Sequence, residues 1–335
     1  MKKKILLIIA ALILLSVGAY LFTPYPAVWL VKQAFSMKKY PLPENYSQLK
    51  SNVVFRRNIG YDSAYPNGVL DIISPKLAAN GKVILWVHGG GYVGDDKKKV
   101  EHYMVALANS SFTVVSINYA LAPKHHYPVQ LKQIEEAYLF IKKHSDDYGF
   151  KVDKLYFGGD SAGAQLVAQF VNIQTNPGYA EQVNADLKDI KIDSVVDTAT
   201  IQGIILFCGP YDLKSFLKPP PDSMKLPYKQ IGWAYFDTRN PNSARIKLSN
   251  VINYISANYP PAFITDGNTN SFEDQAKRLE AALKERGVYV QSVYYPKKEA
   301  KLEHEYQFYM NTEYSKNTLK LLLRFLNRST SKNHS

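Results

Sequence analysis

One serine of the sequence stands in a pattern that favours nucleophilic catalysis. The pentapeptide GDSAG at 159–163 follows a β-rich run at 154–157 and opens an apolar helical pattern at 162–174. Glycines on both sides of a serine permit a tight strand-to-helix turn, which exposes the hydroxyl where backbone donors and the helix dipole favour developing negative charge. An ordinary glycine-rich turn is the alternative, but the strand-turn-helix setting favours Ser161 as a nucleophile.

A glycine-rich segment earlier in the chain supplies candidate donors for an oxyanion. The sequence HGGG at 88–91 directly follows the apolar run 83–87. Because glycines leave their backbone N–H groups unobstructed, we expect those of Gly90 and Gly91, together with that of Ala162, to hold a tetrahedral oxyanion. A phosphate-binding loop is the rival interpretation, but the Walker lysine and the G-x-G-x-x-G spacing are both missing. The histidine of this segment is then a structural member of the loop.

A serine nucleophile needs a general base, and the sequence offers one histidine in a suitable place. Of the seven histidines, His304 lies between the last expected strand, 288–295, and the last helical run, 318–325. The oxyanion loop, the nucleophile and this base then occur in the chain order that an α/β-hydrolase requires. The pair His125 and His126 raises the alternative of a metal site, but no third ligand accompanies it at a recognisable spacing. We therefore expect neither a metal nor a cofactor.

These motifs together resemble the hormone-sensitive-lipase-like branch of the α/β-hydrolase esterases. That family pairs an HGGG loop with a GDSAG elbow, which are found here at 88–91 and 159–163, and 119–124 matches its Y-R-L-A-P-E-like turn with two departures. The resemblance extends from about residue 53 to the C-terminus. It implies hydrolysis of short or medium acyl esters through an acyl-enzyme, without a cofactor or metal.

The acid that would orient His304 is the place where the sequence departs from this family. The resemblance puts an aspartate three positions after Gly267, and that position holds Asn270. An amide accepts a hydrogen bond from the base but brings no charge for the imidazolium. Asp212, after the sixth expected strand, stands where an acid could physically reach the base. Asp266, Glu273 and Asp274 are nearer in sequence, although each is also explained as a charge at a strand end or a helix start. These four carboxylates are the alternatives.

These residues need a scaffold, and the chain from 53 onward alternates β-rich with helical runs. Such alternation indicates a mostly parallel sheet flanked by helices. The eight expected strands are 53–59, 69–74, 82–87, 112–118, 154–157, 201–208, 262–265 and 288–295. The expected helices are 98–108, 129–143, 162–174, 271–286 and 318–325. We therefore predict an α/β-hydrolase catalytic domain over 53–330.

A segment at about 213–259 falls outside this alternation. It is rich in proline and aromatic residues, which are typical of pocket walls. We predict that it is a lid inserted into the catalytic domain. The alternative is an insertion that only covers an edge of the sheet.

The N-terminal residues predict a membrane anchor. Lys2, Lys3 and Lys4 precede an uncharged run at 5–22, whose 18 residues would extend about 27 Å as a helix against a hydrocarbon core of about 30 Å. We predict a single-pass anchor over 1–24 that leaves the catalytic domain outside the cytoplasm. A signal peptide cleaved near 17–19 is the alternative. The following segment, 25–52, is expected to lie near the membrane or over the active site.

The amino-acid composition excludes some kinds of site and of binding partner. Cys208 is the only cysteine, which excludes an internal disulfide and a cysteine-rich metal site. The net charge of +12 suits anionic surroundings, but the basic residues are scattered and no recognition motif accompanies them, so we expect no nucleic-acid partner. The expected partners are a small ester and a membrane. A weakened hydrolase that only binds its ligand, and a lipase or peptidase using the same residues, remain alternatives, and nothing indicates the oligomeric state.

Overall fold

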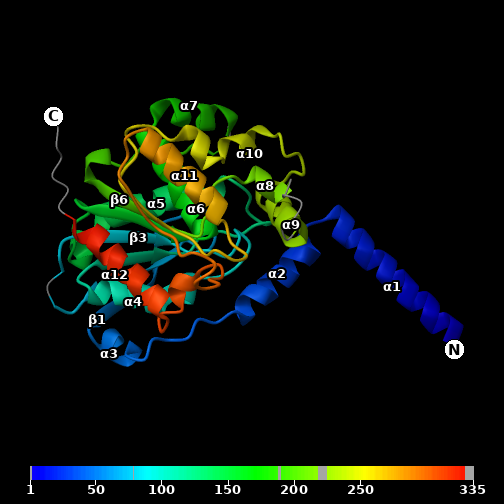
Figure 1. The fold of residues 1–335 in the computed structure, drawn as a ribbon. Coiled ribbons are helices and arrows are strands. Elements are labelled where there is room, and N and C mark those ends of the chain that lie inside the picture. The colour runs from blue at the N-terminus through cyan, green and yellow to red at the C-terminus, as the bar shows by residue number, and fades with distance from the viewer. Residues whose placement is uncertain (1, 78, 188–189, 218–224, 329–335) are drawn as a thin grey trace.

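The computed structural model describes residues 2–77, 79–187, 190–217 and 225–328. Within these residues, eight strands form one sheet in the order β1-β2-β4-β3-β5-β6-β7-β8 (Figure 1). The strands are β1 (Val53–Gly60), β2 (Val69–Pro75), β3 (Val83–Val87), β4 (Thr113–Ile117), β5 (Leu155–Asp160), β6 (Ile201–Phe207), β7 (Ala262–Thr265) and β8 (Val290–Val293). Strand β2 is antiparallel to both of its neighbours, and all other pairs are parallel. The predicted eight-stranded, mostly parallel sheet is confirmed.

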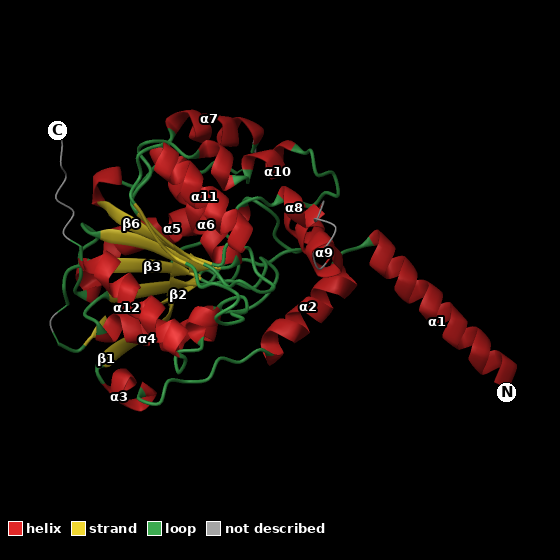
Figure 2. Ribbon diagram, in the orientation of Figure 1, coloured by secondary structure: helices red, strands yellow, loops and turns green. Residues whose placement is uncertain are grey.

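Helices cover both faces of this sheet (Figure 2). The longer helices of the described residues are α1 (Lys2–Phe22), α2 (Tyr25–Met37), α4 (Glu101–Asn109), α5 (Val129–His144), α6 (Ala162–Thr175), α7 (Pro177–Asp186), α9 (Lys225–Phe236), α11 (Glu273–Glu285) and α12 (Glu313–Asn327), of which α1 does not contact the sheet. The shorter helices are α3 (Tyr46–Ser51), α8 (Lys214–Leu217) and α10 (Ala244–Leu248). Short 3₁₀ turns are η1 (Lys97–Val100), η2 (Asp146–Tyr148), η3 (Thr198–Thr200), η4 (Val251–Tyr254) and η5 (Tyr306–Phe308).

Two hydrophobic cores result, one on each face of the sheet. All of β3 is buried, and its residues alternate between the cores: Leu85 packs with α5, α6 and α11, whereas Trp86 packs with α4 and α12. Successive side chains of a strand point to opposite faces, so a strand covered on both sides must be apolar throughout. This explains why the continuous apolar runs in the sequence correspond to the central strands.

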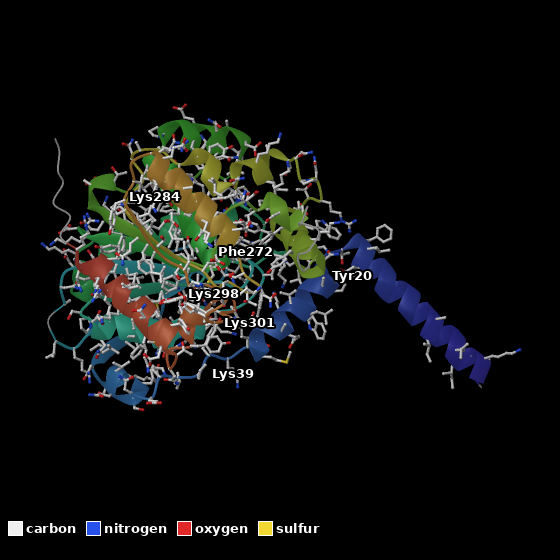
Figure 3. The ribbon with its side chains drawn as sticks, in the orientation of Figure 1. Tyr20, Lys39, Phe272, Lys284, Lys298 and Lys301 are labelled. Atoms are coloured by element: carbon white, nitrogen blue, oxygen red, sulfur yellow. The ribbon has the colours of Figure 1, made fainter. Side chains whose placement is uncertain are left out.

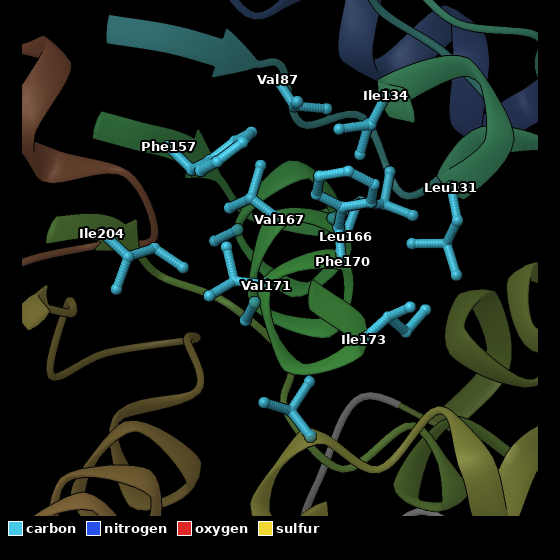
Figure 4. Packing of buried hydrophobic residues seen from close by; sticks show 14 of the residues in the cluster. Val87, Leu131, Ile134, Phe157, Leu166, Val167, Phe170, Val171, Ile173 and Ile204 are labelled. Atoms are coloured by element: carbon cyan, nitrogen blue, oxygen red, sulfur yellow. The ribbon is translucent and has the colours of Figure 1, made fainter. Parts of the chain in front are cut away.

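Helix α6 is the centre of the larger core. Every residue of it is buried. Figure 4 shows its side chains, including Leu166 and Phe170, between the sheet and α5. A Cβ on Gly163 would lie 2.0 Å from the carbonyl oxygen of Val87, so only glycine permits this close approach of α6 to β3. The first turn of α6 is thereby fixed against the carboxyl ends of the central strands, where an α/β sheet places its ligand site.

The N-terminal helices lie at the side of the molecule. Helix α1 projects away from the body, and α2 lies between α1 and the body beside α9 (Figure 1). Over the described residues, no helix is both long enough and apolar enough to cross a membrane. The predicted span at 1–24 therefore has no support from the structure.

The segment predicted as a lid, 213–259, contains α8, α9, α10 and η4. Its residues 218–224 lie outside the described part of the chain. Helix α9 packs against α8 and against α2, so the inserted segment and the N-terminal segment meet. Both lie on the side of the molecule where the carboxyl ends of the parallel strands gather (Figure 1).

Candidate active site

Ser161 occupies the sharp turn between β5 and α6 that its motif predicts. Its backbone angles, φ 51° and ψ −120°, are unusual for a residue with a side chain, and its N–H donates to the carbonyl oxygen of Phe207 at 2.8 Å. A Cβ on Gly159 would lie 2.5 Å from the carbonyl carbon of Gly163. The turn therefore needs glycine on either side of the serine. Helix α6 begins at the next residue, Ala162, so its N-terminus directly follows Ser161.

The structure brings His304 to this serine. The Nε2 atom of His304 lies 2.9 Å from Oγ of Ser161, and the ring packs edge-on against Phe272 at 5.5 Å between centroids. Burial lowers the pKa of His304, and the nearby Glu305 carboxylate acts in the opposite direction. The ring is therefore neutral at neutral pH and can accept the serine proton.

The other nitrogen of the ring contacts a residue that the sequence did not single out. Nδ1 of His304 lies 2.8 Å from Oγ of Ser271, and this hydroxyl in turn donates a hydrogen bond to Oδ1 of Asp266. Asp266 directly follows β7 and is buried. Burial raises its pKa to about 7, although hydrogen bonds from Ser271 and from the Phe272 N–H partly offset this effect. A chain of hydrogen bonds thus runs from Ser161 through His304 and Ser271 to Asp266.

The other candidates for the acid have different partners. Asn270 has a left-handed backbone, φ 49°, and its exposed amide donates to Glu303 at 3.1 Å. Its side chain therefore turns away from His304, contrary to the expectation that it takes the acid position. Asp212 lies 3.6 Å from Arg278. Glu273 and Asp274 form i,i+4 ion pairs on α11, at 2.7 Å with Lys277 and 3.8 Å with Arg278 respectively.

The three predicted oxyanion donors lie together beside Ser161. Gly90, Gly91 and Ala162 line the same pocket as Ser161. Gly90 and Gly91 both have positive φ, at 99° and 59°, and a Cβ on Gly90 would lie 2.2 Å from the carbonyl oxygen of Gly94. The tight turn of this loop therefore requires glycine, and the turn brings its backbone to the site.

Two buried side chains hold the glycine loop in place. His88 stacks on Tyr119 at 4.5 Å, and the Tyr119 hydroxyl donates to the carbonyl oxygen of His88 at 2.9 Å. Asp160 accepts hydrogen bonds from the Trp86 indole at 2.8 Å and from the Gly89 N–H at 2.9 Å. The residue before the nucleophile thus ties the elbow to the loop, and His88 is a structural member of that loop.

A second carboxylate, which the sequence did not single out, lies beside the ring of His304. Oε1 of Glu305 is 3.7 Å from Nε2 of His304. Oε2 of Glu305 accepts hydrogen bonds from the Lys38 ammonium at 3.1 Å and from the Tyr40 hydroxyl. Lys38 also donates to the carbonyl oxygen of His304 at 3.2 Å. The segment that follows α2 therefore contacts the histidine loop directly.

The pocket in front of Ser161 is small and mostly apolar. Its volume is about 80 Å³, the space of roughly three water molecules in the liquid. Phe35 of α2 and the α8–α9 residues Phe216, Tyr228 and Ile231 form much of its wall. Phe272 also lines it, at 6.0 Å from Phe216 and 5.7 Å from Tyr228 between ring centroids. Figure 3 shows Phe272 near the start of α11.

One set of side chains in the described residues has the composition of a metal site. The Cys208 thiol, the Asp266 carboxylate and a ring nitrogen of His304 lie within 4.8 Å of one another. However, both ring nitrogens are already engaged, Nε2 with Ser161 and Nδ1 with Ser271. The hydrogen-bond chain therefore accounts for this cluster without an ion.

Comparison with known protein families identifies the family to which this chain belongs. The family model described as BD-FAE matches residues 70–283, which is more than half of the chain and includes the glycine loop, the elbow and Asp266. The chain belongs to the BD-FAE family. Among curated proteins, it is similar to the acetyl esterase of Salmonella schwarzengrund (strain CVM19633), with 29% identity over 111 residues. That alignment covers 33% of this chain and 34% of the relative, so the chain matches about a third of the length of such relatives.

Solved structures resemble this BD-FAE protein over nearly its whole length. Esterase B from Lactobacillus rhamnosis (HN001) has a TM-score of 0.70 at 19% identity, with 93% of each chain covered. A hyperthermophilic esterase from the archaeon Pyrobaculum calidifontis has a TM-score of 0.64 at 20% identity, with 95% of this chain and 96% of that chain covered. An esterase from the bacterial hormone-sensitive lipase family scores 0.60 at 18% identity, covering 90% and 96%. These likenesses show the fold, and the predicted α/β-hydrolase fold is confirmed.

Proposed function

We propose that this protein is a serine carboxylesterase, of the hormone-sensitive-lipase-like branch, that cleaves short acyl esters. The observation that carries the proposal is the 2.9 Å contact between Ser161 Oγ and His304 Nε2, next to the HGGG loop. Membership of the BD-FAE family supports it, as do the relatives named acetyl esterases. The small pocket favours acetyl and similar groups over longer chains.

The mechanism starts with proton transfer from Ser161 to His304 as Oγ attacks the ester carbonyl. The N–H groups of Gly90, Gly91 and Ala162 stabilise the oxyanion of the tetrahedral intermediate. His304 then gives its proton to the leaving alcohol, which produces an acyl-enzyme on Ser161. Water, deprotonated by His304, attacks this ester in the same way and releases the carboxylic acid. Every proton passes through His304, so the reaction needs no cofactor.

The segment 213–259 would act as the lid of this pocket. Ile231 of α9 and Phe35 of α2 both border the oxyanion loop, since each would lie within 4 Å of a Cβ on Gly91. A medium-length acyl chain would require these side chains to move apart. We therefore propose that α2 and α9 together set the acyl length that the site accepts.

Fluorophosphonate labelling of the full chain tests the proposal. The probe should modify the wild type at Ser161, and Ser161→Ala should abolish labelling without a change in the thermal midpoint. His304→Ala should lose comparable activity, because the two residues act as one unit. A wild type that resists the probe and hydrolyses no ester would indicate a binding protein instead. Profiling p-nitrophenyl acetate, butyrate and octanoate against peptide substrates would separate an esterase from a lipase or peptidase.

We further propose that residues 1–24 attach the protein to a membrane, with the catalytic domain, 53–330, outside the cytoplasm. Three lysines before an apolar run favour this orientation. Helix α2 also exposes Trp29 and Leu30, with exposed fractions of 60% and 59%, and such side chains suit a lipid interface. Cell fractionation should find the full-length protein in the membrane. A soluble mature form that begins near Tyr20 would indicate a cleaved signal peptide.

A further inference from the structure

The catalytic histidine has no fully charged partner on its Nδ1 side. The group that contacts Nδ1 is the neutral hydroxyl of Ser271, and the carboxyl of Asp266 lies behind it. Burial raises the pKa of Asp266 to about 7, so this group is ionised in only part of the molecules at neutral pH. When His304 takes the proton of Ser161, the imidazolium therefore needs stabilisation from elsewhere.

Glu305 lies on the opposite side of the ring. Its Oε1 atom is 3.7 Å from Nε2 of His304, and its side chain is only 11% exposed. This distance exceeds a hydrogen bond, so Nε2 stays available to Ser161. It is nevertheless short enough for a strong Coulomb attraction in a site with little water.

We propose that the carboxylate of Glu305, held by Lys38 and Tyr40, is the negative charge that stabilises protonated His304, while Ser271 fixes the orientation of the ring. Glu305 lines the pocket but neither attacks the ester nor carries the transferred proton, so it is a positioning residue that acts through the charge of His304. This inference rests on the serine mechanism proposed above. It also makes the segment 38–40 part of the catalytic machinery.

The surroundings of Glu305 keep it ionised. Lys38 Nζ and the Tyr40 hydroxyl both donate to Oε2. Burial by itself raises the pKa of Glu305, but the nearby His304 and Lys38 and these hydrogen bonds outweigh it and lower the pKa. The neighbouring Asp160 is a second buried carboxyl. Burial and the charge of Glu305 raise the pKa of Asp160, whereas the donors Lys38 and Tyr40 favour the charged form of Glu305.

The backbone shows that this placement is specific. Glu305 has φ 64°, in the left-handed region that favours glycine. Its N–H donates to the Cys208 sulfur at 3.3 Å, and this contact helps to hold the turn. A carboxylate in this conformation is directed to the inner side of the loop, towards Gly89, rather than to solvent.

Several other groups can influence these charges. Asp266, Cys208 and the exposed Glu303 face His304 or lie next to it. The groups that face Glu305 or its partner Lys38 are Asp95, Asp160, Cys208, Tyr228 and Tyr309. A test must therefore separate the effect of Glu305 from that of its neighbours.

Two substitutions of opposite charge provide this separation. The measurement uses the full chain and p-nitrophenyl acetate. At low pH, kcat/KM falls as His304 becomes protonated, because the ring must be neutral to act as a base, so the midpoint of this acid limb reports the pKa of His304. Glu305→Gln removes an anion, so the limb should move to lower pH by about one unit, and kcat should fall by about tenfold or more. Lys38→Met removes a cation, so the limb should move to higher pH. Loss of packing alone would not produce shifts of opposite sign.

Two further variants serve as controls. Glu305→Asp keeps the charge and should recover part of the kcat that Glu305→Gln loses. Glu303→Gln removes the neighbouring exposed carboxylate, whose effect is screened by solvent, so it should change the limb and kcat little. Thermal unfolding checks that every variant is folded.

The outcomes distinguish this inference from the proposed function. If fluorophosphonate labels the wild type but Glu305→Gln has an unchanged kcat and limb, Glu305 has no electrostatic role. Shifts of the same sign in Glu305→Gln and Lys38→Met would also overturn the inference. Should Glu305→Gln not fold, an unmoved limb in Lys38→Met would overturn it on its own. A wild type that is neither labelled nor active overturns the serine mechanism, and this inference with it.

Discussion

The hydroxyl of Ser271 lies 2.8 Å from Nδ1 of His304, where an α/β-hydrolase of this chain order would be expected to place a carboxylate. The carboxyl of Asp266 is one hydrogen bond further away. The Ser271 hydroxyl can accept a hydrogen bond from the Nδ1–H group of His304 while it donates its own proton to Asp266. This favours the tautomer with the proton on Nδ1, in which Nε2 is free to accept the proton of Ser161. One acid usually both orients the histidine and supplies the negative charge for it. Here Ser271 orients His304, and the charge comes from Glu305.

Ser271→Ala should lower kcat, because Nδ1 then loses the partner that orients the ring. We expect a loss of about ten- to a hundredfold, the range in which positioning hydrogen bonds usually act. Asn270→Asp and Asn270→Ala should change kcat little, because the Asn270 amide contacts Glu303 on the surface. Steady-state kinetics of the three variants on one acetate ester tests both expectations. A large gain in kcat for Asn270→Asp would show that position 270 does reach the base in solution.

Asp266→Asn should make the protein more stable at alkaline pH. The pKa of Asp266 in the folded state, about 7, lies above the ordinary aspartate value, so the unfolded chain releases this proton more readily. The wild type therefore loses stability as the pH rises from about 4 to about 7, and the amide does not. Thermal midpoints of both proteins at pH 5 and pH 8 test this prediction. If Asp266→Asn raised the thermal midpoint more at pH 5 than at pH 8, the prediction would be contradicted.

The pH dependence of the wild type follows from His304. Burial lowers its pKa, and a general base must be unprotonated, so the acid limb of kcat/KM should lie below the ordinary histidine value of about 6.5. Because the unfolded chain binds this proton more readily, the thermal midpoint should also fall as the pH drops below about 6.5. A limb well above pH 7 would show that the carboxylates near His304 outweigh the effect of burial.

Enlarging the pocket should change the preferred acyl length. Ile231→Ala removes a side chain at the wall formed by α9, so kcat/KM for the butyrate ester should rise relative to the acetate ester by about tenfold. Ile246→Ala is a matched control, because Ile246 is equally apolar and buried but belongs to α10 and does not line the pocket. An equal change of preference in both variants would point to general loosening of the fold.

N-terminal deletions should separate the two halves of the N-terminal segment. Removal of residues 1–24 should leave a folded and active domain, because α1 projects away from the body (Figure 1). Removal of residues 1–40 also deletes Phe35, Lys38 and Tyr40, which line the pocket or bind Glu305. The longer deletion should therefore lose kcat as well as acyl selectivity. Esterase assays of the two purified proteins, with thermal unfolding as the check on folding, test this.

The parts of the fold that the sequence predicted are those with strong local signals. The run 83–87 is apolar throughout because β3 is covered on both faces, and the GDSAG turn is recognisable because it needs glycines. Helix α7 was missed because PGYAEQVNAD has little apolar periodicity. Helix α9 was expected only as part of a lid, since Pro227 and Gly232 interrupt its pattern.

The partners of His304 were harder to predict for a different reason. Motif spacing identifies Ser161 and His304, but the Nδ1 partner depends on the path of the loop between β7 and α11. The left-handed turn at Asn270 in that loop exchanges the roles of residues 270 and 271. Lys38 and Glu305 are 267 positions apart, and no local pattern links them.

The separation of Lys38 from Glu305 also bears on when the site can form during synthesis. A chain grows from its N-terminus, so the α2 segment, the glycine loop and Ser161 are all made long before the histidine loop. Until Glu305 emerges, Lys38 and Tyr40 lack the carboxylate that they bind, and Ser161 lacks its base. A nascent or C-terminally clipped chain would therefore contain the serine but no reactive nucleophile. Reactivity towards a fluorophosphonate would thus mark only those molecules in which the two distant segments have met.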